Sequence, residues 1–116
     1  MKIIGIIPAR MGASRFPGKP LKLIKGKPMI EHVFERAKMY KQWSTLSLAT
    51  CDKEIEKFSK SKNYKCIMTS KKHTRCLDRV FEATNKLKEK PNNNDIIVCV
   101  QGDEPLLYPK MIKAVV

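Results

Sequence analysis

An apolar run near the start of the chain stops at a proline and turns into a basic, glycine-rich loop. Residues 3–7 read I-I-G-I-I and leave no room for a helix before Pro8, so they predict a buried strand. The loop that follows reads P-A-R-M-G-A-S-R-F-P-G-K-P-L. Its glycines let backbone N–H groups approach an anion, and its prolines hold one backbone shape. Such a loop after a buried strand suits a polyanion, most simply a nucleoside triphosphate.

Two common phosphate-binding loops are excluded. Five residues separate Gly12 from Gly18, one more than a Walker loop has, and Pro20 stands where that loop carries Ser or Thr. The sequence G-x-G-x-x-G does not occur. The alternative is a basic surface loop without a ligand, but the coincidence of strand, glycines and cations favours a phosphate site.

The rest of the chain alternates between strand and helix patterns. Apolar spacing predicts helices over 28–40, over 53–62 with Asp52 as the cap, over about 77–87, and from Pro109 onward, and strands over 44–50, 64–69 and 96–100. Residues 22–27 are expected to be a short connection. This order predicts an α/β fold with one parallel sheet and helices on both faces. Ligands bind such sheets beyond the carboxyl ends of the strands, at a switch point.

A second polar turn, Gln101-Gly102-Asp103-Glu104-Pro105, follows the strand predicted over 96–100. A carboxylate beside a glycine just past a buried strand is a suitable Mg²⁺ ligand, because Mg²⁺ takes one or two carboxylates together with substrate phosphates. Asp103 is therefore the candidate metal ligand. The alternative is a capped turn with two solvated acids.

Composition leaves one different function class open. The formal net charge is +13, from 24 Lys and Arg against 11 Asp and Glu spread along the chain. A basic module that binds nucleic acid is therefore an alternative, although aromatic residues do not alternate with the basic ones. The four cysteines show no zinc spacing, so we expect reduced, mostly buried thiols in a cytoplasmic protein. No apolar run reaches the roughly 20 residues of a membrane span, so no membrane partner is expected.

The first loop, I-I-P-A-R-x-G-A-S-R-F-P-G-K-P-L, resembles the opening signature of the sugar-acid cytidylyltransferases, most of all those that use 3-deoxy-manno-octulosonate (Kdo). The resemblance implies a Rossmann-like nucleotide-diphospho-sugar transferase fold, of which residues 1–116 are the nucleotide-binding N-terminal half, truncated. It implies transfer of CMP from CTP to Kdo with Mg²⁺, in lipopolysaccharide or other cell-surface glycan synthesis. It also implies a homodimer for the full-length enzyme. The second metal-binding Asp and most sugar contacts would lie in the later half.

The resemblance also assigns roles to individual residues. Arg10 and Lys19 would bind the triphosphate with help from Arg15, Lys19 would stabilise the leaving pyrophosphate, and Asp103 would hold Mg²⁺. Arg10, Lys19 and Asp103 are thus the expected catalytic residues. The expected nucleotide-binding residues are Pro8, Ala9, Arg10, Gly12, Ser14, Arg15, Lys19, His73, Asp78, Arg79 and Gln101. No protein nucleophile is needed, because the hydroxyl of the sugar attacks the α-phosphate in line.

One stretch departs from the Kdo pattern. His73, Asp78 and Arg79 match it, but Arg75, Cys76 and Leu77 replace its Ser-Gly-Thr. The tetrad C-L-D-R is closer to the V-L-D-R of the related cytidylyltransferases of spore-coat polysaccharide synthesis. A different surface sugar therefore stays open as the acceptor.

Overall fold

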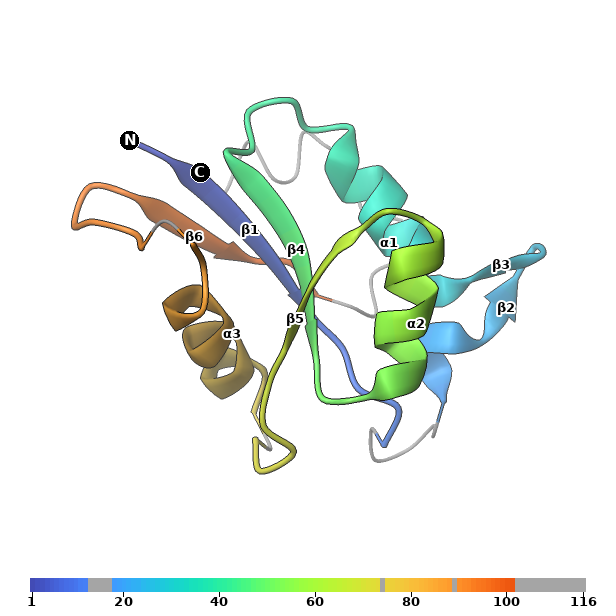
Figure 1. Cartoon of the computed structure of the whole chain (residues 1–116). Coiled ribbons are helices and arrows are strands. Elements are labelled where there is room, and N and C mark those ends of the chain that lie inside the picture. The colour runs from blue at the N-terminus through green and yellow to red at the C-terminus, as the bar shows by residue number, and fades with distance from the viewer. Residues whose placement is uncertain (13–17, 74, 89, 102–116) are drawn as a thin grey trace.

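The centre of the protein is a four-stranded parallel sheet (Figure 1). The structure is a computed structural model, and it describes residues 1–12, 18–73, 75–88 and 90–101. The strands lie in the order β5-β4-β1-β6, and every neighbouring pair is parallel. Their bounds are β1 (Ile3–Pro8), β4 (Thr45–Thr50), β5 (Lys65–Met68) and β6 (Ile96–Cys99). The expected parallel sheet and its four strands are confirmed.

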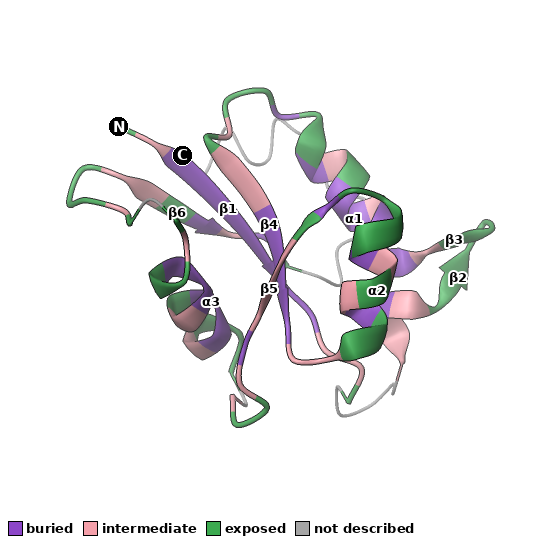
Figure 2. Cartoon of the chain, viewed as in Figure 1, coloured by how far each residue is buried: buried purple, intermediate pink, exposed green. Residues whose placement is uncertain are grey.

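Helices cover both faces of this sheet, as the sequence predicts. The bounds are α1 (Met29–Lys38), α2 (Lys53–Ser61) and α3 (Cys76–Asn85). In Figure 1, α1 and α2 lie on one side of the sheet and α3 on the other. Alternating side chains of β1 pack on the two faces of the sheet. Ile7 belongs to the same buried cluster as Ile30 and Val33 of α1, and Ile6 belongs to the same cluster as Val80 of α3. Figure 2 shows β1 buried along its whole length.

Gly5 lies in β1, where packing leaves no room for a side chain. A Cβ atom at this position would lie 2.7 Å from Leu46 Cδ1 and 2.8 Å from Trp43 Cζ3. Trp43 is itself held, because its indole N–H donates a hydrogen bond of 2.8 Å to the carbonyl oxygen of Ala37 at the end of α1. The glycine thus lets the central strand approach the segment that leads into β4.

The segment before α1 is more structured than expected. A 3-10 helix, η1 (Lys19–Leu21), leads into a small antiparallel hairpin of β2 (Leu23–Ile24) and β3 (Lys27–Pro28). Between its strands Lys25 and Gly26 have φ values of 52° and 83°, and two successive positive φ values are typical of tight hairpin turns. The prediction of a short connection over 22–27 was wrong. Residues that adopt positive φ in hairpin turns are usually Asn, Asp or Gly, and Lys25 is none of these, so the sequence did not indicate the turn.

Pro28 and His32 show how this hairpin joins the first helix. Pro28 was expected inside the first turn of the helix, but it is the N-cap residue, with extended backbone at ψ 145°. His32 lies in the first turns of α1. Its ring Nε2 lies 2.6 Å from the carbonyl oxygen of Ile24, so it ties α1 to β2.

The third helix is present but ends earlier than the apolar spacing suggested. Leu77 and Phe81 are 70% and 72% exposed, whereas Val80 and Ala83 are buried against the sheet. Leu77 and Phe81 therefore lie on the outer side of α3, and small residues make the contact. The helix expected from Pro109 lies outside the described residues. No helix in the described part of the chain is long and apolar enough to cross a bilayer.

Candidate functional site

The strand order changes direction between β1 and β6. The chain passes from β1 to β4 and then to β5 on one side, and β6 returns to the other side of β1. The backbone N–H of Val100 donates to the carbonyl oxygen of Ile6 at 2.9 Å, so the exposed Gln101 lies near the carboxyl end of β1. We call this place, formed by residues 8–12 and 100–101, the β1–β6 edge. Ligands bind parallel sheets at such switch points.

Main-chain hydrogen bonds hold the beginning and the end of the basic loop. The N–H of Ala9 donates to the carbonyl oxygen of Ala49 at 2.9 Å, which continues the pairing of β1 with β4. The N–H of Gly18 donates to the carbonyl oxygen of Met11 at 2.7 Å and closes the loop on itself. Gly18 has a φ of 78°, a left-handed conformation that glycine adopts without steric cost. The two ends of the loop, at Met11 and Gly18, are therefore held next to each other.

Asp52 has a different role from the expected one. It is the N-cap residue of α2, but its side chain makes no capping hydrogen bond. Instead its Oδ2 accepts a hydrogen bond of 2.7 Å from the N–H of Met11, while its own N–H donates to Thr50 Oγ1 at 3.1 Å. The predicted cap position is confirmed, but the side chain forms a charge-assisted hydrogen bond to the loop amide rather than to an amide of the helix. Asp52 thus anchors the first turn of the basic loop.

Two arginines from distant parts of the sequence converge on one carbonyl oxygen. Arg10 Nη1 lies 3.5 Å from the main-chain oxygen of His73, and Arg79 Nη2 lies 3.3 Å from the same atom. Arg79 Nη1 also donates to Thr69 Oγ1 at 3.0 Å. The structure thus brings together three predicted nucleotide-binding residues: Arg10, Arg79 and His73.

Neither of these two guanidinium groups forms an ion pair with another residue that the structure describes. Arg79 is only 3% exposed, and no carboxylate among the described residues forms an ion pair with Arg79 or Arg10. Burying a cation is costly unless a counter-charge compensates it. Two guanidinium groups without a described ion-pair partner are the kind of charge that an anionic ligand can neutralise.

The loop that carries the shared carbonyl is held by a residue that sequence reasoning missed, Glu82 on α3. Glu82 Oε1 accepts hydrogen bonds from the N–H of Ser70 at 2.9 Å and from His73 Nε2 at 2.6 Å. Its Oε2 forms an ion pair with Lys86 Nζ at 2.9 Å. Lys86, then Ser70 and His73, lower the pKa of Glu82 from 4.5 to about 2. The only hint in the sequence was the i, i+4 spacing of Glu82 and Lys86, which is typical of any exposed helix.

The remaining predicted site residues differ in their burial and in their partners. Asp78 pairs with Arg75 Nε at 3.2 Å; the side chain of Arg75 is 80% exposed and that of Asp78 is 43% exposed. Pro8 and Ala9 are buried, and Gly12 is exposed. Lys19 is half-buried at the start of η1, beside Gly18. The predicted residues Ser14, Arg15 and Asp103 lie outside the described residues.

Metal-binding side chains do not cluster in the described part of the chain, where no three His, Cys, Asp or Glu side chains lie close enough to hold an ion. The predicted Mg²⁺ site depends on Asp103 and stays a prediction. The four cysteines are free thiols, but Cys76 is exposed and Cys51, Cys66 and Cys99 are half-buried. They are thus less buried than expected.

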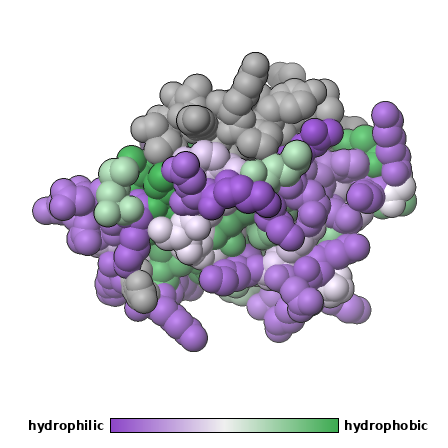
Figure 3. Space-filling view, turned by 90° about the horizontal axis from the view of Figure 1, so that it is seen from above, coloured by the Kyte–Doolittle hydropathy of each residue, from purple (hydrophilic) through white to green (hydrophobic). Residues whose placement is uncertain are grey.

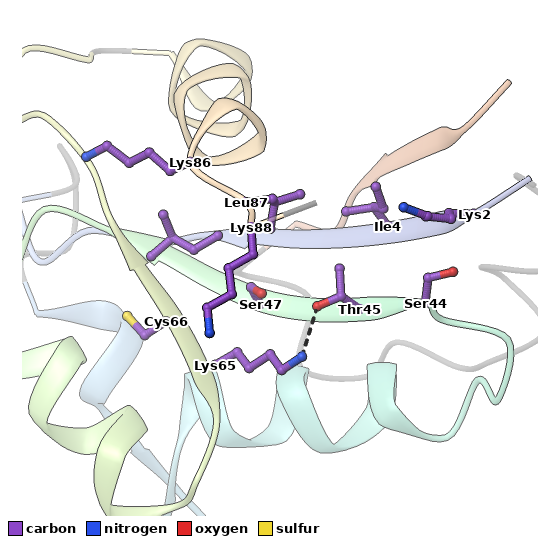
Figure 4. A pocket seen from close by; sticks show the side chains of 11 residues that line it. Lys2, Ile4, Ser44, Thr45, Ser47, Lys65, Cys66, Lys86, Leu87 and Lys88 are labelled. Atoms are coloured by element: carbon purple, nitrogen blue, oxygen red, sulfur yellow. Dashed lines mark hydrogen bonds between the residues drawn. The ribbon is translucent and has the colours of Figure 1, made fainter. Parts of the chain in front are cut away.

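A separate pocket of about 530 Å³ opens at the other end of the sheet (Figure 4). Its lining includes Lys2, Lys65 and Lys88, and Lys65 donates to Thr45 Oγ1 at 3.4 Å. Lys2 and Thr45 lie where β1 and β4 begin, so the pocket is remote from the β1–β6 edge. Figure 3 shows hydrophilic residues over most of the coloured surface in the view from above, with apolar ones between them.

Comparisons with known proteins identify relatives along the whole chain. The model of a family described as "Cytidylyltransferase" matches residues 4–116. The 3-deoxy-manno-octulosonate cytidylyltransferase of Thermodesulfovibrio yellowstonii is 46% identical over 97% of this chain and 45% of its own length. The 8-amino-3,8-dideoxy-manno-octulosonate cytidylyltransferase of Shewanella oneidensis is 42% identical over 100% of this chain and 46% of its own. The chain thus spans about half the length of these curated relatives.

Solved structures resemble the chain in the same way. A CMP:2-keto-3-deoxy-manno-octonic acid synthetase complexed with CTP superposes with a TM-score of 0.86 at 38% identity, over 98% of this chain and 45% of that one. A cytidylyltransferase from Leptospira borgpetersenii gives a TM-score of 0.80 at 27% identity, over 98% of this chain and 47% of that one. A 4-diphosphocytidyl-2C-methyl-D-erythritol synthase, at 17% identity and a TM-score of 0.75 over 97% of this chain and 52% of that one, shares the fold.

Proposed function

We propose, because this chain belongs to the cytidylyltransferase family, that it binds CTP at the β1–β6 edge and contributes to transfer of CMP to a sugar acid. The observation that carries the proposal is the convergence of the Arg10 and Arg79 guanidinium groups on the carbonyl oxygen of His73. No described carboxylate pairs with either group, so a triphosphate is the natural counter-charge. The structural neighbour that was solved with CTP supports the choice of nucleotide.

The acceptor we propose is Kdo. Its support is the relative from Thermodesulfovibrio yellowstonii, which is named for that sugar. The relative from Shewanella oneidensis is named for the 8-amino sugar and has a similar identity, 42% against 46%. The two relatives thus support an eight-carbon sugar acid as the acceptor, but they differ in the group that this acid carries at C8.

In the proposed reaction the hydroxyl of the sugar attacks the α-phosphorus of CTP, the new phosphate ester forms, and pyrophosphate leaves. The protein supplies position and stabilises charge. Arg10 would hold phosphate oxygens at the β1–β6 edge, the buried Arg79 would add its charge from behind the carbonyl of His73, and Lys19 would stabilise the departing pyrophosphate. Mg²⁺, held by Asp103 and the phosphates, would neutralise part of the charge that develops. The chain spans about half the length of its relatives. Nucleotide binding by this chain is therefore our main proposal, and catalytic turnover by this chain alone is a weaker one.

Calorimetric titration with CTP, ATP, GTP and UTP in the presence of Mg²⁺ tests the nucleotide. We expect CTP to bind most tightly, and equal affinity for all four nucleotides would contradict the cytidine assignment.

A matched pair of arginine variants tests the site against the nucleic-acid alternative. Arg10→Ala should weaken CTP binding by about 1.5–3 kcal/mol, the range for hydrogen bonds to charged groups. Arg75→Ala removes an exposed arginine that pairs with Asp78, and it should leave CTP affinity nearly unchanged. A protein that binds nucleic acid through dispersed charge would lose duplex DNA affinity about equally in both variants. That result, with CTP binding unaffected by Arg10→Ala, would favour the alternative.

A further inference from the structure

The position of Arg10 depends on a loop from another part of the sequence. Its guanidinium group reaches the main-chain oxygen of His73 at 3.5 Å, a long hydrogen bond that aligns the group only while the carbonyl stays in place. The loop over residues 70–73 joins β5 to α3, and such connections are mobile unless contacts hold them. What holds this loop therefore also orients Arg10.

Helix α3 holds His73 through both its main chain and its ring. Arg79 donates to the carbonyl oxygen at 3.3 Å, and Glu82, three residues later on the same side of the helix, binds the ring Nε2 at 2.6 Å. The same Glu82 Oε1 accepts from the N–H of Ser70 at 2.9 Å. One carboxylate oxygen thus binds both ends of the loop.

We propose that Glu82 is a positioning residue for the nucleotide site, an inference that rests on the proposed function. Glu82 fixes the 70–73 loop, the loop fixes the carbonyl of His73, and that carbonyl orients the Arg10 guanidinium toward the triphosphate. The atom that matters is Oε1, which holds the loop. The ion pair of Oε2 with Lys86 is on the outer side and is not required.

Two variants of Glu82 separate geometry from charge. Glu82→Gln keeps an oxygen at the position of Oε1 and removes the charge, whereas Glu82→Asp keeps the charge and withdraws the oxygens by one methylene. Lys86→Met is the control for the ion pair: it removes that pair and the hydrogen bond of 2.7 Å from Lys86 Nζ to the carbonyl oxygen of Met68, and it leaves Oε1 in place. The measurements are CTP affinity by calorimetry and the Arg10 Nε–H signal in ¹⁵N NMR spectra, identified by its loss in Arg10→Lys.

We expect Glu82→Asp to weaken CTP binding about five- to tenfold, as loss of a coupled contact does, and to shift the Arg10 signal. Glu82→Gln and Lys86→Met should stay within about twofold of the unmodified chain, as surface changes do, with the Arg10 signal unmoved. The opposite order, with Glu82→Gln impaired and Glu82→Asp intact, would overturn the proposal. An Arg10 signal unmoved in Glu82→Asp would overturn it as well.

Two further outcomes are decisive. If Glu82→Asp does not fold, Glu82→Gln decides alone: normal CTP affinity supports positioning by Oε1, and loss of affinity overturns it. If the unmodified chain binds no CTP, the proposed function fails, and the Arg10 signal in the two Glu82 variants still decides whether Glu82 positions that side chain.

Discussion

Replacing Asp52 with alanine tests whether the start of the basic loop must be anchored for nucleotide binding. The carboxylate accepts a hydrogen bond of 2.7 Å from the N–H of Met11. Hydrogen bonds to charged groups contribute about 1.5–3 kcal/mol, and the half-buried position of Asp52 places its contribution near the lower end, about 1.5 kcal/mol. The free energy of unfolding should fall by that amount.

The same change should weaken CTP binding by a separate mechanism. Without this anchor, the backbone at Met11 keeps only the hydrogen bond from Gly18 to its carbonyl oxygen, so it is less ordered before CTP binds. Ordering one residue costs about 1–2 kcal/mol, which corresponds to a dissociation constant about tenfold higher. Asp52→Asn keeps an acceptor oxygen and should retain most of the affinity. Urea unfolding and calorimetric titration with CTP measure the two effects.

Asp95 provides the matched control for this experiment. Its carboxylate also accepts main-chain hydrogen bonds, from Lys2 at 2.8 Å and from Asn92 at 2.9 Å, but it lies at the opposite end of the sheet. Asp95→Ala should lower stability without changing CTP affinity. If Asp52→Ala behaves like Asp95→Ala, with lower stability and normal CTP affinity, anchoring of the loop by Asp52 has no part in nucleotide binding and the reasoning is refuted.

Three further predictions concern stability and are measured by urea unfolding. Gly5→Ala should lower the free energy of unfolding by about 1–3 kcal/mol through overpacking, whereas Gly12→Ala, with open space at its Cβ position, should not; equal effects would contradict the packing argument. The lowered pKa of Glu82 means that its ionised form stabilises the folded state, so this stabilisation is complete above pH 4.5 and is lost as pH falls toward 2. Glu82→Gln should remove this pH dependence of the free energy of unfolding, and identical pH profiles for the variant and the unmodified chain would contradict the prediction. Val80→Ala should cost about 1.5 kcal/mol for two buried carbon groups, and the exposed Phe81→Ser less than about 0.5; the reverse order would mean that α3 packs through its other face.

Much of the fold follows from local pattern. The strand before Pro8 and the strand over 96–100 are apolar runs, and their parallel pairing follows from the helices between them. The location of the site at the carboxyl ends follows from that topology rather than from any single residue. The resemblance of the first loop added Arg10, and that of residues 73–79 added Arg79.

Contacts between distant segments could not be predicted in this way. Asp52 fits the pattern of a helix cap, and only the position of Met11 in three dimensions shows that its carboxylate binds elsewhere. Glu82 fits the pattern of an exposed helical residue, because a sequence does not indicate how a preceding loop folds back. Leu77 and Phe81 follow helical spacing, yet they lie outside because the sheet beneath α3 accommodates Val80 and Ala83.

Three described acidic side chains, Asp52, Glu82 and Asp78, have partners other than the guanidinium groups of Arg10 and Arg79. Asp52 is engaged by an amide, Glu82 by Ser70, His73 and Lys86, and Asp78 by an exposed arginine. If any of these carboxylates paired with Arg10, part of the positive potential would be cancelled before a ligand arrived. A neutral main-chain oxygen orients a guanidinium group without neutralising it, so the carbonyl of His73 can order Arg10 and Arg79 while their charge has no ion-pair partner among the described residues. That combination suits a ligand with several phosphate groups, because each added negative charge strengthens binding at no further cost in ordering the protein.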